Sequence, residues 1–175
     1  MLRFLILSHH YRSPIDYSDT LVSQATQSLT TLTEFLEKLA FASDHAPNSL
    51  AHGTNTSSFL VPYEARFTEA MDDDFNTPQA LATLFACIHA FQTHVWLLSR
   101  NETTALHNFL SQKLALLGIV PVIHKIPASL HRLLTQREQS RASAQFIKAD
   151  SLRKKIEGLG YTVEDTPLGQ FVRRK

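Results

Sequence analysis

Apolar residues recur every three or four positions over several long stretches of the 175-residue chain. In the first stretch Ser18 is a candidate helix N-cap with Asp19 in the first turn, and the apolar positions are Leu21, Ala25, Leu29, Leu32, Leu36 and Leu39. This pattern predicts an amphipathic helix of about six turns, at 3.6 residues per turn. From Ala42 to Ser58 the pattern disappears, and the sequence is typical of a polar loop.

The same spacing predicts further helices before residue 142. A short helix is expected from Pro62, and a longer one has Thr77 as its N-cap and Pro78 at its first position. A third helix is capped by Asn101 and ends at Gly118, and a fourth runs from about Pro127 toward Arg141. Amphipathic helices of this kind need one another to bury their apolar stripes. The fold class expected for residues 1–140 is therefore an antiparallel helical bundle.

The end of the chain has a different pattern. Residues 144–158 are predicted to form one more helix, with Gly160 as its left-handed stop. Tyr161 to Asp165 and Gln170 to Arg173 are then predicted as two short strands around a turn. The whole chain is expected to be mainly α, with a small mixed α+β unit over residues 141–175.

Composition narrows the class of protein. An apolar content of 43% is enough for a sizeable core. The single cysteine, Cys87, lies in an apolar run, which excludes an internal disulfide and a cysteine metal cluster and fits a reducing, cytoplasmic setting. The apolar run within the first ten residues is too short for a secretory signal or a membrane span, so no membrane partner is expected.

Charge is distributed unevenly along the chain. Residues 1–136 hold 8 Lys and Arg against 11 Asp and Glu, whereas residues 137–175 hold 9 against 5, a net of +4. This surplus indicates contact with a polyanion near the C-terminus, with a solvated basic tail as the alternative. Arg141, Arg173, Arg174 and Lys175 are the candidate phosphate ligands.

Asp72, Asp73 and Asp74 form an acidic run that has two interpretations. Just before a helix N-terminus, carboxylates interact favourably with the helix dipole and suit a connecting turn. A divalent metal site would need further oxygen ligands at defined spacing, and the calcium-loop pattern is absent. The structural interpretation is favoured, and an independent metal-dependent enzyme built on these residues remains an unfavoured alternative.

Motifs for other chemistry are missing. The nine histidines lack zinc-site spacing, and the sequence has no glycine-rich phosphate loop and no G-x-S-x-G elbow. No catalytic residue and no cofactor site is predicted for this chain.

The predicted helix over residues 144–158 carries a polar strip beside its apolar stripe. Phe146, Asp150, Arg153 and Glu157 recur at i, i+4, i+7 and i+11. An aromatic face, a hydrogen-bond acceptor and a guanidinium group are what proteins use to read unstacked bases in single-stranded RNA. A core Phe146 with a surface Asp150–Arg153 ion pair is the other interpretation, and the spacing alone slightly favours it.

Three stretches resemble the C-terminal portion of cysteinyl-tRNA synthetase. They are LRFLILSHHYRSPIDYS at the start, MDDDFNTPQALATLF in the middle and REQSRASAQFIKADSLRKKIEGLGYTVEDTPLGQFVRRK at the end. The resemblance implies a helical bundle that supports tRNA(Cys), followed by a small domain that binds the anticodon loop. It places anticodon contacts on Arg141, Asp150, Arg153 and Asp165, with Phe146 at a position that is usually aromatic.

The resemblance also implies what this chain does not carry. The nucleotide-binding core and the zinc site of the family lie outside this sequence, so ATP and zinc are expected only in that catalytic part, and the chain alone is not expected to aminoacylate. Two positions depart from the family ending P-Q-G-T-x-W-R-R, because Leu168 replaces the glutamine and Val172 the tryptophan. The partners expected are tRNA(Cys) and the catalytic domain, in cis or in trans.

A second hypothesis assigns the chain to another class. A stand-alone helical interaction module, with little RNA affinity of its own, would dock on a separate catalytic polypeptide. The dense apolar run from Leu2 to Leu7 favours this interpretation.

Overall fold

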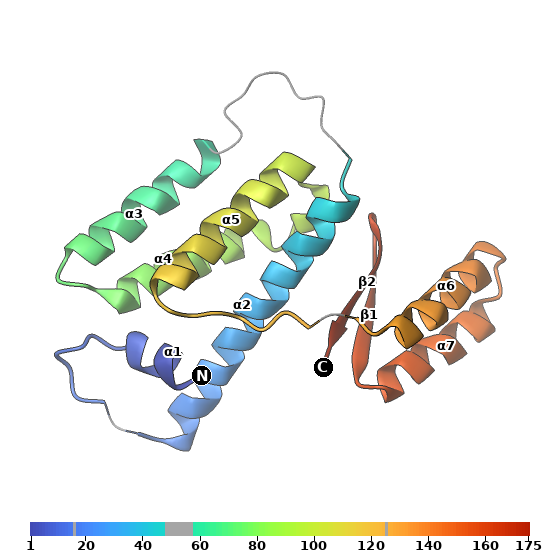
Figure 1. Ribbon diagram of the computed structural model, residues 1–175, viewed down its shortest axis with the longest axis horizontal. Helices are drawn as coiled ribbons and strands as arrows, with labels where there is room; N and C mark the ends of the chain where they lie inside the picture. Colours follow the sequence, from blue (N-terminus) through green and yellow to red (C-terminus); the bar gives the residue numbers. More distant parts are fainter. Residues whose placement is uncertain (16, 48–57, 125) are drawn as a thin grey trace. The chain divides into compact units, whose positions relative to one another are not determined.

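The computed structural model describes residues 1–15, 17–47, 58–124 and 126–175, which form two compact units, Met1–Val122 and Ile123–Lys175. The first unit contains α1 (Leu2–Leu7), α2 (Asp19–His45), α3 (Val61–Asp72), α4 (Thr77–Phe91) and α5 (Arg100–Leu116), with short 3-10 turns at Ser58–Leu60 and Val95–Leu97. The second unit contains α6 (Ala128–Ala142), α7 (Phe146–Gly158), β1 (Tyr161–Thr166) and β2 (Gly169–Arg174) (Figure 1). The predicted class, a helical bundle followed by a small α+β unit, is confirmed.

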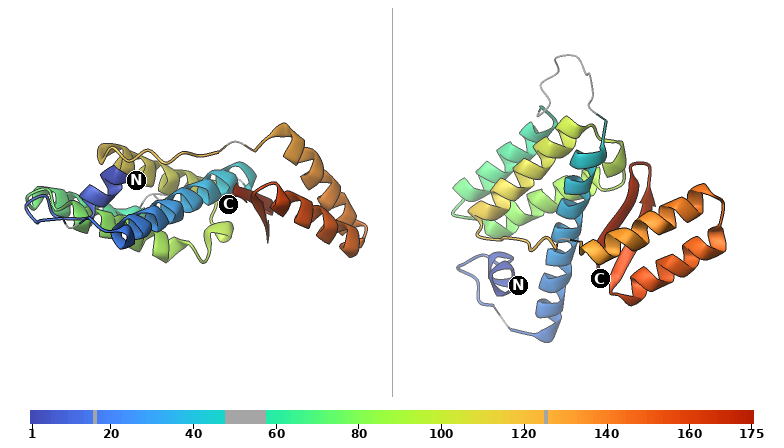
Figure 2. Two further views of the ribbon diagram at one scale, coloured as in Figure 1. Left: turned by 90° about the horizontal axis from the view of Figure 1, so that it is seen from below. Right: turned by 45° about the vertical axis from the view of Figure 1, so that its right-hand side comes forward.

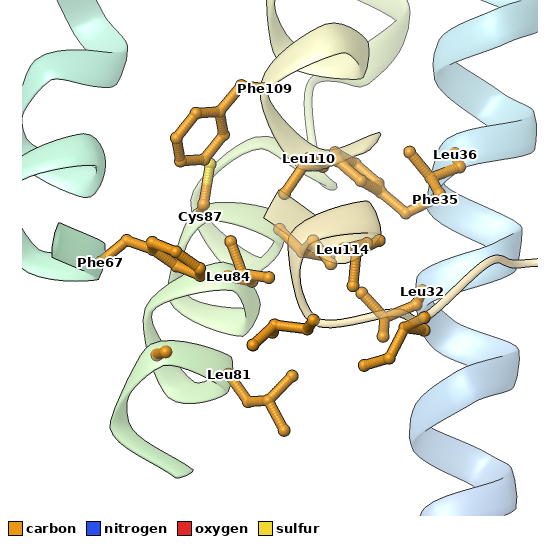
Figure 3. Packing of buried hydrophobic residues seen from close by; sticks show 14 of the residues in the cluster. Leu32, Phe35, Leu36, Phe67, Leu81, Leu84, Cys87, Phe109, Leu110 and Leu114 are labelled. Atoms are coloured by element: carbon orange, nitrogen blue, oxygen red, sulfur yellow. The ribbon is translucent and has the colours of Figure 1, made fainter. Parts of the chain in front are cut away.

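The first unit is built from two helix pairs. α2 packs along α5, α3 packs against α4, and the short α1 contacts α2 and α4. Side chains from four of these helices meet between them, as Figure 3 shows; they include Leu32, Phe35, Phe67, Leu84, Cys87, Leu110 and Leu114. Each fully buried side chain of this size contributes about 1.5–3 kcal/mol relative to its exposed state. The apolar stripes of the sequence therefore face one common core.

α2 begins as predicted and ends later. The Ser18 side chain accepts a hydrogen bond from the Leu21 amide at 3.3 Å, which satisfies one of the free donors of the first turn. The helix continues to His45, and Ala42 is completely buried. The prediction of a polar loop from Ala42 was wrong for its first four residues, because Ala42 still packs on the core. Of the rest of that predicted loop, residues 48–57 lie outside the described residues, and Ser58 begins a 3-10 turn.

Two predicted caps are displaced by one or two residues. Asn76, not Thr77, caps α4, because its side-chain oxygen accepts from the Gln79 amide at 3.2 Å. Ser99, not Asn101, caps α5 in a reciprocal capping box with Glu102, at 3.3 Å and 2.8 Å. In both cases the predicted cap lies inside the first turn of the helix, and a polar residue just upstream makes the capping hydrogen bond.

The end of α5 is tied to the start of the chain. Gly118 has φ +66, the left-handed conformation that favours glycine, and its carbonyl accepts a hydrogen bond from the Arg3 guanidinium. A Cβ at this position would lie 2.9 Å from Arg3 Nη1. Phe4 and Leu5 of α1 are buried, so the N-terminal apolar run is part of the core of the first unit.

The second unit is a helix hairpin packed on a strand hairpin. α6 and α7 lie side by side in both views of Figure 2, and α7 contacts β1. The strands pair antiparallel with Val163 opposite Val172 and Asp165 opposite Gln170. Leu130, Ile156, Val163 and Val172 form a small core of their own. The alternation of the strands thus directs Val163, Asp165, Gln170 and Val172 toward the helices.

The division between the units lies earlier than the expected boundary at residue 140. α6 belongs to the second unit, because it packs on α7 and its Leu130 enters the small core. Residues 123–175 hold 11 Lys and Arg against 5 Asp and Glu, a net of +6, whereas residues 1–122 hold 6 against 11, a net of −5. The charge asymmetry of the sequence is therefore a difference between two folded units.

Candidate nucleic-acid interface

A buried guanidinium lies at the centre of the charged cluster in the second unit. Arg137 of α6 is only 1% exposed. Its Nη1 donates to Asp165 Oδ1 at 2.7 Å and its Nη2 to Asp165 Oδ2 at 2.8 Å, the bidentate geometry that suits an arginine and a carboxylate. Nη1 also donates to Gln170 Oε1 at 2.6 Å. The Gln170 amide in turn donates to the Leu134 carbonyl at 3.2 Å, so α6 is bonded to both strands.

A second arginine shares the same carboxylate. Arg141, one helical turn after Arg137, places Nη1 3.2 Å from Asp165 Oδ2. The hydrogen bonds from Arg137 lower the pKa of Asp165 below its ordinary value, and the charges of Arg141 and Arg153 lower it further. Asp165 is therefore an anion whose oxygens already have partners, and it holds Arg141 in place at the surface.

The polar strip of α7 lies beside this cluster. Asp150 and Arg153 are exposed, and Arg153 Nε donates to Glu157 Oε1 at 3.0 Å across one helical turn. The pKa of Arg137 is raised chiefly by its hydrogen bonds to Asp165, and the negative charge of Asp150 adds a smaller contribution. The charge of Arg153 likewise adds to the lowering of the pKa of Asp165 by Arg137, so Asp150 and Arg153 both lie within electrostatic range of the central pair. Arg153 pairs with Glu157; no ion pair between Arg153 and Asp150 is present among the residues described.

Phe146 distinguishes the two interpretations of the strip. It is the first residue of α7 and is 60% exposed, whereas Ala149, Leu152 and Ile156 of the same helix are buried. A core role for Phe146 is therefore wrong. Its ring lies on the same side of the helix as Asp150 and Arg153, as the four-residue and seven-residue spacings require.

The terminal arginines are separated from this strip. In the strand register Arg174 lies opposite Tyr161, four residues from Asp165, which corresponds to about 13 Å at 3.3 Å per residue. Arg173 lies opposite Thr162 on the other face of the hairpin. The structure therefore brings together Arg141, Asp150, Arg153 and Asp165, with Phe146 at one end, and does not bring Arg173 or Arg174 to the same place.

The departures near the chain end have structural roles. Val172, at the family tryptophan position, is 6% exposed and packs in the small core with Val163. Phe171 is 3% exposed. Neither side chain presents a face for a base, so the exposed ring of this unit that adjoins the strip is Phe146.

The acidic run Asp72–Asp74 forms the connection between α3 and α4. Asp72 ends α3, and Asp73 accepts from the Asn76 side chain at 3.2 Å. Asp74, in the left-handed region at φ 52, accepts from Tyr11 Oη at 2.8 Å and pairs with Arg12 at 3.1 Å. These contacts fasten residues 11–12 to the turn, which agrees with the structural interpretation.

The described residues contain neither a metal-binding cluster nor a helix suited to a membrane. No group of three or more His, Cys, Asp or Glu side chains is placed to hold a metal ion among them. Within the same residues, none of the helices has the length and apolar character needed to span a bilayer.

Comparison with known families agrees with the division of the fold. Residues 66–121 match the family model described as DALR domain, and residues 124–173 match the one described as Cysteinyl-tRNA ligase anticodon binding domain. The chain is therefore an anticodon-binding portion of an aminoacyl-tRNA ligase, in which a helical bundle is followed by a small α+β domain. More particularly, the chain carries the DALR and anticodon-binding domains of cysteine-tRNA ligases, the C-terminal portion of those enzymes.

Similar curated proteins are named cysteine-tRNA ligase. The protein of Caldicellulosiruptor saccharolyticus is 32% identical over 177 residues, which cover 99% of this chain and 38% of that protein. The proteins of Methanosarcina mazei and Latilactobacillus sakei are each 32% identical, over 180 and 176 residues, and again 99% of this chain is covered. The chain spans somewhat over a third of the length of these relatives, 38% and 37% of the latter two.

Arg137 is the residue that sequence reasoning missed. It begins the charged stretch REQSR but lies in a helix whose other charged residues are exposed. One signal was present in the sequence, because Arg137 is seven residues after Leu130 and three after Leu134 and so falls on the buried stripe of α6. A charge on an apolar stripe needs a partner, and Asp165 supplies it.

Proposed function

We propose that this chain binds tRNA(Cys) and that its second unit reads the anticodon loop, while the catalytic part of a cysteine-tRNA ligase uses ATP and cysteine. The observation that carries the proposal is the exposed Phe146 ring beside an acid and two partly exposed arginines, in a domain that matches the anticodon-binding family model. The net charge of +6 on residues 123–175 supports binding to a polyanion.

Each group in the strip has a chemical task in this proposal. The Phe146 ring stacks on an unpaired base. The Asp150 carboxylate, which has no ion-pair partner among the described residues, accepts hydrogen bonds from the Watson–Crick edge of guanine. Arg141 and Arg153 are each nearly half exposed, at 44% and 47%, and offer guanidinium planes and donors to bases or phosphates.

Asp165 has a different role from Asp150. Both of its oxygens accept from Arg137 and one also lies close to Arg141, so it orients Arg141 for the RNA and has little capacity left for a base. Arg173 and Arg174 bind phosphates outside the strip. The catalytic part, with its ATP and zinc sites, acts in cis or in trans in the cytoplasm, and this chain alone is inactive in aminoacylation.

The test is equilibrium binding of a labelled tRNA(Cys) anticodon stem-loop, compared with a hairpin of the same stem and an unrelated loop, at several salt concentrations. Tighter binding of the first RNA, with a salt slope that reports several phosphate contacts, is expected. Equal affinity for the two hairpins at every salt concentration would argue against anticodon recognition.

A second candidate function rests on the surface of the first unit. Met1, Leu2, Ile6, Val120 and Val122 are large apolar residues that remain about half exposed or more. They line, with their neighbours, a cavity of about 830 Å³ between α1 and the segment that follows α5. This surface favours docking on a separate catalytic polypeptide. In that case the chain would bind the polypeptide in a mixing experiment and show no preference for the anticodon stem-loop.

A further inference from the structure

The solvent-facing side of α7 combines an exposed apolar residue with lysines. Ile147 is 90% exposed, more than any other large apolar residue among those that the structure describes. Lys148, Lys154 and Lys155 of the same helix are also exposed. We call Ile147, Lys148, Ser151, Lys154 and Lys155 the outer face of α7. This face is distinct from the strip of Phe146, Asp150 and Arg153, and no residue of it figures among the anticodon contacts above.

Helical geometry places this face away from the core. At 100° per residue, Ile147, Ser151 and Lys154 lie opposite the buried Ala149, Leu152 and Ile156. Two shallow hollows follow the face. One, of about 650 Å³, is lined by Ile147, Asp150, Ser151, Lys154 and Lys155. The other, of about 600 Å³, is lined by Phe146, Ile147, Lys148 and Ser151 with residues 144–145. The two share Ile147 and Ser151 and so form one continuous surface.

The lysines of this face are available to an external anion. None of Lys148, Lys154 and Lys155 has an ion-pair partner within the residues that the structure describes. The ion pairs that Arg137, Arg141 and Arg153 make with Asp165 and Glu157 lie instead in the strip or in the cluster around Asp165. The outer face is therefore locally basic, with the exposed aliphatic side chain of Ile147 at its N-terminal end.

We propose that the outer face of α7 is a second RNA contact, which holds the backbone and one unpaired nucleotide next to those that the strip reads. The inference rests on the proposed function and extends it. Charge complementarity favours a polyphosphate, and the apolar Ile147 favours an unstacked base or ribose above it. Asp150 lines the first hollow and also belongs to the strip, so a strand bound to the strip runs onto this face without a gap.

The experiment uses the whole chain and the tRNA(Cys) anticodon stem-loop as the probe. Lys154→Ala/Lys155→Ala is expected to weaken binding about fivefold or more and to lower the salt slope by about 1.4, which is about 0.7 for each phosphate of a single strand that is no longer neutralised. Ile147→Ser is expected to weaken binding about threefold or more with an unchanged salt slope. Both variants should still discriminate between the stem-loop with guanine at anticodon position 34 and one in which that base is replaced, with the same ratio of affinities as the parent.

A matched control removes the same charge elsewhere. Arg66→Ala/Arg132→Ala deletes two exposed arginines that have no ion-pair partner among the described residues, one in each unit. Arg132 lies about 200° around α6 from the buried Leu130. This control is expected to change the affinity by less than about twofold. All these substitutions are at exposed positions, so circular dichroism and melting should be unchanged.

The outcomes separate this inference from the proposed function. If the parent chain discriminates base 34 and the outer-face variants bind as tightly as the parent, the second contact is overturned and anticodon reading stands. If the parent does not prefer the stem-loop to the unrelated hairpin, both are overturned. If the outer-face variants lose affinity only for vesicles containing phosphatidylserine and keep it for RNA, the face binds an anionic membrane and the inference is again overturned.

Discussion

Arg137 and Asp165 are joined by two parallel hydrogen bonds between α6 and β1, at 2.7 Å and 2.8 Å. Arg137 is fully buried, whereas the side chain of Asp165 is 36% exposed. The pair thus connects the interior of the second unit with its proposed RNA-binding surface, because Asp165 also contacts the exposed Arg141.

Removing the buried partner should destabilise the second unit. Arg137→Met leaves the Gln170 side-chain oxygen without its donor and Asp165 with Arg141 alone, and it is expected to lower the free energy of unfolding by about 2–3 kcal/mol. This expected loss is smaller than the roughly 3–5 kcal/mol that follows removal of one partner from a fully buried ion pair, because Asp165 remains partly solvated. Native-state hydrogen exchange of amides in residues 123–175 measures the change. Arg132→Met, on the solvent side of the same helix, is the control, and an equal effect of the two substitutions would refute the role of the pair.

The same pair predicts a pH dependence. The pKa of Asp165 is lowered from its ordinary 3.8 by the hydrogen bonds from Arg137. At a pH between the pKa of Asp165 in the folded chain and its pKa in the unfolded chain, the unfolded chain binds more protons, so the free energy of unfolding rises with pH. The stabilisation from this pair is complete above the unfolded-state pKa and is lost as the pH falls through the folded-state pKa. Urea unfolding at pH 7, 4 and 2.5 should show this loss in the parent and less of it in Asp165→Asn; identical profiles would contradict it.

The stacking role of Phe146 can be separated from folding. Since the side chain is 60% exposed, Phe146→Ala should change the free energy of unfolding by less than about 0.5 kcal/mol. Binding of the anticodon stem-loop should weaken by about 1–3 kcal/mol, the usual contribution of one base–aromatic stack. Tyr17→Ala, at a 71% exposed aromatic of the first unit, is the matched control. Unaltered RNA affinity in Phe146→Ala would remove the ring from the site.

Cys87 should be chemically silent in the folded protein. Burial raises the pKa of its thiol to about 12, and the residue is completely buried between α4 and its neighbours. Because the thiolate is the reactive form, alkylation by iodoacetamide at pH 8 is expected only after the first unit unfolds. Mass spectrometry over a urea series measures this, and rapid labelling in the absence of urea would show that the core opens.

Sequence patterns predicted most of the helices because each stripe is long and regular. The stripe from Leu21 to Leu39 and the Ser18 cap were sufficient for α2, and the turn residues from Thr166 to Gly169 were sufficient for the strand hairpin. Cap identities were less accurate, as at Asn76 and Ser99, since several neighbouring polar residues can cap a helix and only the backbone geometry selects one.

The candidate site was predictable in part. The i, i+4, i+7 spacing on α7 correctly grouped Phe146, Asp150 and Arg153, because all three lie on one helix. The pairing of Arg137 with Asp165 joins residues 28 positions apart, and helical spacing carries no information on such a contact. The separation of Arg174 from the strip also depended on the strand register, which the sequence did not define.

The proposed function depends on recognition of one anticodon base by the strip on α7. The most direct measurement is the affinity of the chain for the tRNA(Cys) anticodon stem-loop with guanine 34 and with that base replaced, in the parent, Asp150→Ala and Arg174→Ala. We expect the parent to prefer guanine, Asp150→Ala to lose the preference, and Arg174→Ala to bind both RNAs more weakly but keep the preference. Equal affinities of the parent for the two stem-loops would show that the strip does not read this base.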